Sequence, residues 1–300
     1  YSGGVIPNVS TSSPTPTEVY IDKESLRIDR IKNNKNDKLC RITMSFDMRM
    51  FTRCFTPKSV YPDTISDLVV WLSADSNVTF NIPTKKSSAW GDKSVQSNSV
   101  SQSTVLNQPL RYGYDGAADK SMISFNGTSQ YFTSNFNAPI TANDFTLFAV
   151  CKYTDLTNTS QRIFTVKETT DRLNFGIDAT GSIFLKGIDD LGFNGSVLSG
   201  AGEGFGSFCI AMGQFEKIVG GSNINVQWND AAMHTTFVAN FNNNNTGFDD
   251  AVFTLGFIDG GSALNYFKGD FCELLVYNKA LSTDEASQVR EYLNNKYKIY

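Results

Sequence analysis

The sequence predicts an all-β domain of the sandwich or jelly-roll type that ends in one short helix. Aromatic residues are plentiful, with 23 Phe and 12 Tyr among 300 residues, and such side chains favour strands. Between positions 61 and 300, about a dozen short apolar or alternating runs recur at roughly ten-residue spacing, separated by clusters of Gly, Asn, Asp and Ser. Only the last segment has the apolar period of an amphipathic helix.

The first 60 residues differ in character from the rest and divide into two parts. Residues 1–17 are small, polar and interrupted by proline, which indicates an extended arm. Residues 18–60 contain two alternating runs, SLRIDRI and LCRITMSFDMRMF, around the polar stretch KNNKND. This pattern predicts a β-hairpin. So short a segment cannot readily bury a core alone. We therefore expect it to pair with the following domain, another copy of the chain or a different protein.

Residues 61–300 form one domain in this interpretation. The runs predicted as strands have the sequences LVVWLSA, MISFNG, QYFTS, FTLFAVCKY, RIFTVKE, LNFGID, SIFLKG, FCIAMGQF, NINVQWND, FTLGFID and FCELLVY.

A helix is predicted directly after the last strand. Ser282 and Glu285 have the spacing of a capping box, and Asp284 and Glu285 place negative charge in the first turn, where the helix dipole favours it. An apolar stripe follows at helical spacing: Ala286, Val289, Leu293 and Tyr297. The acidic residues of this stretch therefore have a structural explanation, and Glu291 is expected on the solvent side.

Composition excludes several kinds of partner and site. The net charge of −4 lacks the basic excess of a nucleic-acid-binding protein, and no run of about 18 apolar residues exists to insert into a membrane. The five cysteines are odd in number and show no C-x-x-C pattern, which argues against a disulfide framework or a zinc site. Cys151, Cys209 and Cys272 lie in apolar runs. They are expected as buried, reduced thiols, which favours folding in a reducing compartment.

Motifs at both ends of the 61–300 segment occur in a recognisable order. The motifs are DLVVWLSADSNVTF, WGDKS, QPL, ISFNGTSQYF and FTLFAVCKY, followed at the C-terminus by GDFCELLVYN and ALSTDEASQVREYLNNKY. Together they resemble the concanavalin A-like lectin/glucanase superfamily, in its LamG-like jelly-roll branch, over about residues 62–300. The motifs are specific for a fold rather than for a function.

The resemblance implies a concanavalin A-like β-sandwich of two curved antiparallel sheets, preceded by the arm and the hairpin. It also implies that Trp71 and Trp90 are structural. The implied core positions are Val70, Leu72, Phe125, Phe132, Phe148, Val150, Phe164, Phe271 and Leu275.

Hydrolytic members of this superfamily carry an E-x-D-x-(x)-E motif, which places two carboxylates on one face of a strand. This chain departs from that pattern, because the residues two positions from Glu273 are Phe271 and Leu275. The single histidine, His234, has no nucleophile motif beside it. We therefore predict that the protein is not an enzyme, with a glycoside hydrolase as an alternative.

Polar loops are the candidate binding sites, because the resemblance implies glycan binding and a sugar needs an aromatic face and planar polar groups. The ligand-binding candidates are Asp189, Asp190, Asn194, Trp228, Asn229 and Asp230. Calcium is the candidate cofactor, since it takes carboxylate and carbonyl oxygens. The metal-binding candidates are Asp249, Asp250 and Asp259. Each cluster also has the composition of an ordinary turn.

The leading hypothesis is a non-catalytic adhesion or carbohydrate-recognition module displayed on a virus particle, as a phage fibre, spike or decoration protein. Display on a cell surface or an extracellular location is the alternative. Its partners would be a glycan or a host-surface receptor and, through residues 1–60, other virion subunits or copies of itself. A purely structural virion subunit, whose jelly roll contacts its neighbours, is a second hypothesis.

Overall fold

The computed structural model describes residues 61–113, 120–135, 144–157, 160–167, 172–188, 194–199, 205–239, 252–257 and 265–300. The chain divides into Tyr1–Lys58 and Ser59–Tyr300, and every described residue belongs to the second unit. The predicted arm and hairpin, with Cys40 and Cys54, lie outside the described residues.

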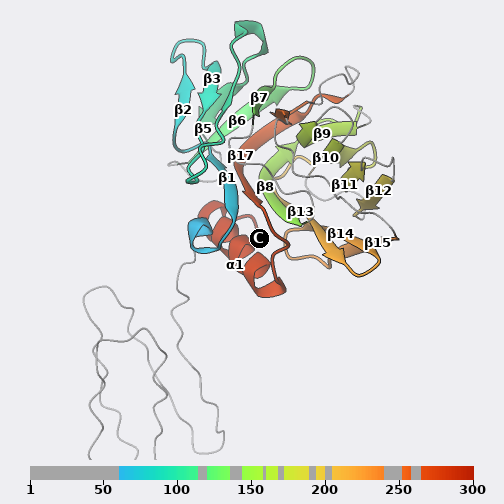
Figure 1. Ribbon diagram of the computed structural model, residues 1–300. Helices are drawn as coiled ribbons and strands as arrows, with labels where there is room; N and C mark the ends of the chain where they lie inside the picture. Colours follow the sequence, from blue (N-terminus) through green and yellow to red (C-terminus); the bar gives the residue numbers. More distant parts are fainter. Residues whose placement is uncertain are drawn as a thin grey trace, which may run out of the picture. The chain divides into compact units, whose positions relative to one another are not determined.

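Two antiparallel sheets pack face to face in this part of the chain (Figure 1). Sheet A has the order β15-β14-β13-β8-β17-β6-β5, and β1 also pairs with β17. Its strands are β1 (Leu68–Ser73), β5 (Leu110–Gly113), β6 (Ser121–Asn126), β8 (Phe145–Tyr153), β13 (Cys209–Ile218), β14 (Gly221–Trp228), β15 (His234–Ala239) and β17 (Lys268–Tyr277).

Sheet B has the order β12-β11-β10-β9-β16-β7-β4-β3-β2. Its strands are β2 (Val78–Phe80), β3 (Ser87–Trp90), β4 (Val100–Ser101), β7 (Phe132–Asn135), β9 (Ser160–Lys167), β10 (Arg172–Asp178), β11 (Ile183–Ile188), β12 (Asn194–Leu198) and β16 (Val252–Leu255). The helical elements are the 3₁₀ turns η1 (Pro62–Thr64) and η2 (Val105–Asn107) and the helix α1 (Thr283–Tyr297). The predicted two-sheet β-sandwich with a C-terminal helix is therefore confirmed.

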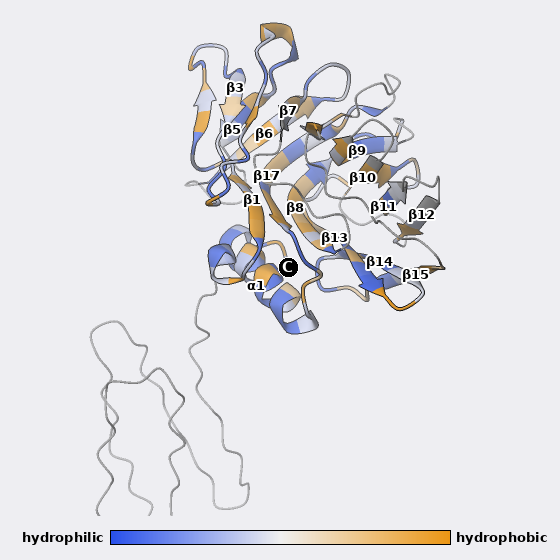
Figure 2. Ribbon diagram, viewed as in Figure 1, coloured by the Kyte–Doolittle hydropathy of each residue, from blue (hydrophilic) through white to orange (hydrophobic). Residues whose placement is uncertain are grey.

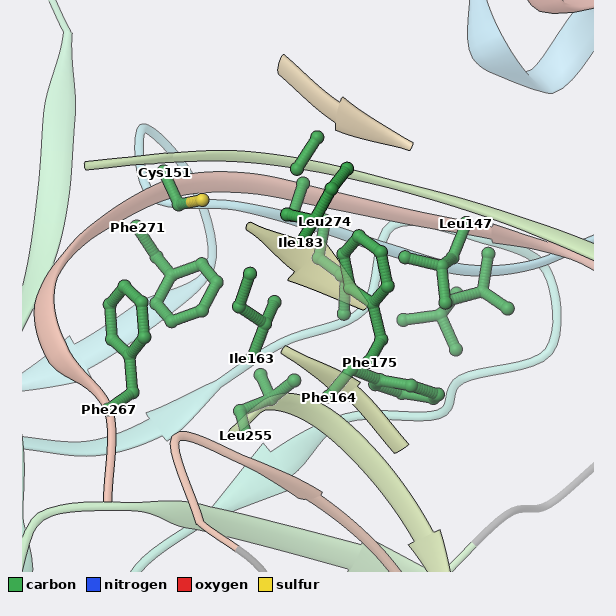
Figure 3. Packing of buried hydrophobic residues seen from close by; sticks show 14 of the residues in the cluster. Leu147, Cys151, Ile163, Phe164, Phe175, Ile183, Leu255, Phe267, Phe271 and Leu274 are labelled. Atoms are coloured by element: carbon green, nitrogen blue, oxygen red, sulfur yellow. The ribbon is translucent and has the colours of Figure 1, made fainter. Parts of the chain in front are cut away.

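The main core lies between the sheets. Side chains of sheet A, such as Cys151 and Leu274, meet side chains of sheet B, such as Ile163 and Leu255 (Figure 3). All nine core positions implied by the resemblance are buried, and so are both tryptophans, Trp71 and Trp90. Burial of this much apolar surface is the main stabilising contribution to such a fold.

A second apolar layer joins the outer face of sheet A to α1. The hydrophobic side of this helix faces the sheet (Figure 2), and the predicted stripe from Ala286 to Tyr297 is fully buried. Ser282 and Glu285 form the predicted capping box, and Glu291 is exposed as expected. Phe148, Val150 and Leu275 belong to this layer rather than to the core between the sheets.

A β-bulge in β17 decides which face Glu273 occupies. Strict alternation would place Phe271, Glu273 and Leu275 on one side of the strand. The register against β8 shifts between Phe271 and Glu273, so Phe271 turns into the core between the sheets while Leu275 lies on the side of α1. A bulge re-aims side chains in this way. Glu273 consequently faces the helix.

Cys151, Cys209 and Cys272 are buried and form no disulfide bond among the described residues, as predicted. Burial raises the pKa of the Cys272 thiol well above its usual value, which keeps this sulfur protonated and unreactive. Within the described residues, α1 and the two 3₁₀ turns are too short or too polar to cross a membrane.

Candidate functional site

A polar groove of about 400 Å³ lies where the outer face of sheet A meets the start of α1. Strands β13, β14 and β15, with the turn before β15, supply one wall, and the start of α1 with the two residues before it supplies the other. The lining residues are Gln214, Glu216, Asn223, Asn225, Met233, Thr235, Leu281, Ser282, Thr283 and Ala286. Glu216 is the one charged residue in this lining.

The groove is polar because of the alternation along β14. Ile224, Val226 and Trp228 point into the core between the sheets, so the intervening residues face outward. The outward residues of β14 are Asn223, Asn225 and Gln227. Asn223 and Asn225 lie outside the apolar layer between sheet A and α1, so polar side chains are accommodated there. These amides therefore open onto the groove, except for Gln227, whose Oε1 accepts a hydrogen bond of 2.7 Å from Arg290 of α1.

Gln214 and Asn225 form the floor of the groove. They are directly paired across β13 and β14, and Asn225 Nδ2 donates to Gln214 Oε1 at 2.8 Å. Gln214 Nε2 donates to the carbonyl of Leu281 at 2.8 Å, which ties the floor to the chain entering α1. On the other side, Thr235 donates to Asn225 Oδ1 at 2.7 Å. The hydrogen bonds hold these amides in fixed orientations.

Glu216 and Asn223 form the next pair along the same strands and stand at the outer end of the groove. Asn223 Nδ2 donates to Glu216 Oε2 at 3.1 Å. Both side chains are only partly buried. The pair therefore presents a carboxylate and an amide oxygen to solvent, and both are hydrogen-bond acceptors.

The helix start closes the opposite wall. Glu285 accepts hydrogen bonds from the backbone N–H of Ser282 at 3.0 Å and from Lys279 at 2.7 Å. The Lys279 hydrogen bond is the largest cause of a lowered pKa for the Glu285 carboxyl. The capping box thus fixes the hydroxyl wall of the groove formed by Ser282 and Thr283.

A second cluster of charged and aromatic side chains surrounds Glu273 beneath α1. Its Oε1 accepts from Trp71 Nε1 at 2.7 Å and from the Tyr292 hydroxyl at 3.0 Å. Its Oε2 accepts from Lys296 at 2.6 Å and from the Tyr297 hydroxyl at 2.7 Å. The side chain of Glu273 is completely buried. A carboxylate with four donors and no exposed surface fastens the helix to the sheet and cannot reach a solvent-borne substrate.

The predicted site residues fall in three places. Asp189, Asp190, Asp249, Asp250 and Asp259 lie outside the described residues. Asn194 begins β12, and its side chain is likewise not described. The remaining candidates are Trp228, Asn229 and Asp230, which follow one another at the end of β14.

Trp228 occupies an inward position of its strand and is 2 % exposed. Its indole N–H donates to Ser199 at 2.9 Å, and its ring stacks near Tyr153. A ring buried in this way packs in the core and offers no face to a sugar at the surface. Asn229 shapes the turn, with φ of 46° and its Oδ1 accepting from the backbone of Ile210 at 2.8 Å. Asp230 is exposed beside these two.

Sequence reasoning missed the groove because it searched for polar loops. The signal was present in NINVQW, where amides alternate with apolar residues. Alternation alone marks a strand with one solvated face. It does not show that a helix more than fifty residues later borders that face. Among the described residues, no cluster of His, Cys, Asp or Glu has the arrangement of a metal site.

No protein-family profile matches the sequence, and no curated protein matches it. Solved structures share its fold. The binding domain of botulinum neurotoxin serotype D superposes with a TM-score of 0.51 at 13 % identity, covering 75 % of this chain and 51 % of the toxin domain. The receptor binding domain of the mosaic serotype C/D toxin has the same TM-score and identity, covering 75 % and 50 %.

A SAP-like pentraxin from Limulus polyphemus aligns over 57 % of this chain and 82 % of its own, with a TM-score of 0.44 at 16 % identity. The chain spans about half the length of the toxin domains. At these identities the likeness concerns the jelly-roll fold, and the matched proteins include domains described as binding domains.

Proposed function

We propose that residues 61–300 form a non-catalytic carbohydrate-recognition domain of the concanavalin A-like type and that its glycan binds in the groove between sheet A and α1. The observation that carries this proposal is the pair of cross-strand rows, Gln214–Asn225 and Glu216–Asn223, that face an open groove. Residues held by fixed hydrogen bonds lose little conformational entropy when a ligand arrives.

The chemistry of the groove suits a sugar. Sugar hydroxyls both donate and accept hydrogen bonds, and the wall offers amides, hydroxyls and one carboxylate, which do the same. Met233 and Ala286 add apolar surface for the C–H groups of a sugar ring. The volume of about 400 Å³ falls in the usual range for sites that bind small molecules.

The same residues argue against glycoside hydrolysis. That reaction needs two carboxyl groups, about 5–5.5 Å apart in retaining enzymes and about 6.5–9.5 Å apart in inverting ones. The groove lining contains one carboxyl group, that of Glu216. The carboxyl group of Glu273 is buried beneath the helix. Binding without bond cleavage is the function that these positions support.

Display on a virus particle, with a cell surface as the alternative, completes the proposal. One support is the alternating sequence of residues 18–60, which is too short to bury a core alone and is expected to pair with a partner. The other is the three buried thiols, which suit assembly in a reducing cytoplasm. The solution masses of the full chain and of residues 59–300 test the role of the N-terminal segment. Assembly of the full chain alone supports an anchor in residues 1–58, and two monomers would overturn it.

A blocking substitution tests the groove itself. Thr283 lines the groove and is exposed at the start of α1, so Thr283→Trp fills the space with an indole ring. The matched control is Asn295→Trp, which places the same ring on the exposed side of the same helix, about three turns beyond Thr283 and outside the lining. The full chain is first screened against an array of immobilised glycans, and the best glycan is then titrated into each variant.

We expect Thr283→Trp to weaken glycan binding by about tenfold or more, equivalent to about 1.4 kcal/mol of binding free energy, while Asn295→Trp binds like the unmodified protein. Thermal melting confirms that both variants are folded. Equal binding by all three proteins would move the site elsewhere. An array without any bound glycan would refute carbohydrate recognition.

A further inference from the structure

We propose that the outer end of the groove is a subsite for an uncharged sugar, in which Phe237 is the stacking platform and Glu216 with Asn223 holds adjacent hydroxyls. This inference rests on the proposed function, and it adds the class of glycan and the residue that selects it. Three observations carry it: the exposed ring of Phe237, its position beside the Glu216–Asn223 pair, and the charge of the surrounding side chains.

Phe237 is a large aromatic residue that is 51 % exposed. It lies on β15, the edge strand of sheet A, directly opposite Asn223 of β14. Its neighbour Val238 packs against the core between the sheets, so Phe237 points to the outer face, the face that carries the groove. Directly opposed residues have Cβ atoms about 5 Å apart. The ring therefore belongs to the same outer surface as Asn223 and Glu216.

Gly221 explains why this ring lies against the sheet. Gly221 is two positions before Asn223 on β14 and therefore on the same face. A Cβ atom at this position would lie 2.9 Å from Cε2 of Phe237 and would also clash with the carbonyl of Val238. The missing side chain leaves room for the ring beside the strand. One side of the ring is supported by the sheet, and the exposed half is available to the C–H face of a sugar.

Beside this platform, the carboxylate of Glu216 has an unused oxygen. Asn223 donates to Oε2, and within the described part of the chain Oε1 accepts no hydrogen bond. Asn223 itself keeps its Oδ1 as an acceptor. Two adjacent acceptors at fixed separation suit two neighbouring hydroxyl donors of a sugar ring whose C–H face stacks on Phe237.

Charge decides which sugars fit. No lysine or arginine lines the groove. Glu216 supplies one negative charge, and Asp284 with Glu285 supplies two more in the first turn of α1 beside Thr283. Lys279 is paired with Glu285 at 2.7 Å. The positive end of the helix dipole is thus offset by its own acidic residues. A sialic acid, uronic acid or sulfated sugar would meet the like charge of Glu216 and no cation within the groove lining.

The test uses the full chain and pairs of glycans that differ in one charged group. Terminal galactosides, glucosides and N-acetylhexosaminides are compared with their sialylated or sulfated counterparts by titration calorimetry. We expect the uncharged glycan of a pair to bind about tenfold more tightly, because a second negative charge near Glu216 is repelled. Tighter binding of the charged glycan would overturn the inference.

Three variants identify the residues that select the sugar. Phe237→Ala is expected to weaken binding by about three- to tenfold through loss of ring stacking, and Phe237→Tyr is expected to restore it. Glu216→Gln is expected to reduce the preference for uncharged glycans. The matched control is Phe205→Ala, because Phe205 is 52 % exposed but lies beside Tyr153, at the opposite end of β8 from the groove.

The outcomes separate this inference from the proposed function. If Thr283→Trp abolishes binding while Phe237→Ala and Phe205→Ala behave alike, the groove binds glycan and the stacking subsite is refuted. If Phe237→Ala alone loses affinity and keeps its melting temperature, the subsite is supported. If no glycan binds the unmodified protein, both the proposed function and the subsite fail.

Discussion

The ammonium group of Lys296 lies 2.6 Å from Oε2 of Glu273, and the side chain of Glu273 has no exposed surface. Lys296 also pairs with Asp75 at 3.0 Å. A buried charge is costly unless it is paired and hydrogen-bonded. Here one residue of β17 receives donors from β1 and α1, so the polar contacts specify where the helix docks on the sheet.

Glu273→Gln removes one partner of this buried ion pair. We expect the free energy of unfolding to fall by about 3 kcal/mol, the lower end for breaking a buried pair, because Asp75 still neutralises Lys296. Chemical denaturation followed by tryptophan fluorescence measures the change. The control is Glu291→Gln on the exposed side of α1, expected within about 0.5 kcal/mol of the unmodified protein.

A double substitution separates the charges from the packing. Glu273→Gln combined with Lys296→Met removes both ions, and we expect it to cost less than the sum of the two single substitutions. If the changes in unfolding free energy of the two single substitutions add up to that of the double substitution, the two side chains are energetically independent.

Alkaline pH should weaken the attachment of α1. Burial opposes the charge of Lys296, but the attraction of Glu273 and Asp75 outweighs it and raises the pKa of Lys296. Burial and Glu273 also raise the pKa of Tyr292 and of Tyr297. Each group keeps its proton longer in the folded state. The unfolded chain therefore releases protons first, and stability falls as pH rises above about 10.

Unfolding by urea at a series of pH values from 8 upward measures this decline. Free tyrosine and lysine side chains ionise above about pH 9. In Tyr292→Phe one of the three groups no longer titrates. We therefore expect the stability of this variant to fall less steeply between about pH 9 and pH 11 than that of the unmodified protein. An unchanged slope would show that Tyr292 does not contribute to the alkaline transition.

The capping box should give stability that is lost in acid. Ser282→Ala is expected to cost about 1 kcal/mol, the usual value for losing a cap. The folded-state pKa of Glu285 is lowered, chiefly by the hydrogen bond from Lys279. Its contribution is therefore present above the unfolded pKa of about 4.3 and lost as pH falls through the folded value. Glu285→Gln should be destabilising at pH 7 and nearly neutral at pH 2, by thermal melting at both pH values.

A substitution of Trp228 tests whether this residue packs in the core or binds a sugar. Trp228→Phe keeps a ring in the core but removes the indole N–H that bonds Ser199. We expect a loss of stability of about 1–3 kcal/mol, typical for a buried hydrogen bond that loses one partner. Glycan affinity should not change when it is measured well below the melting temperature. A large loss of affinity with unchanged stability would return Trp228 to the binding site.

Much of the fold could be predicted because the long buried strands have strong local patterns. FTLFAVCKY and FCELLVY became β8 and β17, whose residues are almost all buried. Short or exposed strands were missed. Strand β15, with HTTFVA, is exposed at nearly every position, so nothing in its composition demands a sheet. Its pairing with β14 is a tertiary contact that hydrophobic periodicity cannot report.

The candidate site was predicted less well, and the reason lies in two residues. One of the four donors to the Glu273 carboxylate, Trp71, lies about two hundred residues earlier in the sequence, and the face that Glu273 occupies depends on a bulge that the sequence does not mark. Phe237 is of a residue type usual in cores, yet it is half exposed because it lies on the outer face of the edge strand β15, and Gly221, opposite Ala239 two positions along that strand, leaves room for its ring beside the sheet. Both effects depend on which strands become neighbours.

The place of β17 in sheet A also has a consequence for the time course of folding. This strand is the last of the described strands in sequence, yet it lies between β8 and β6 and is the partner of β1. A ribosome would deliver it after every other strand described here. Until then β1 has no partner in its sheet, and the edges of β8 and β6 stay open to other chains. Contacts between residues so distant in sequence form slowly. Sheet A can therefore be completed only after every other described strand has been synthesised.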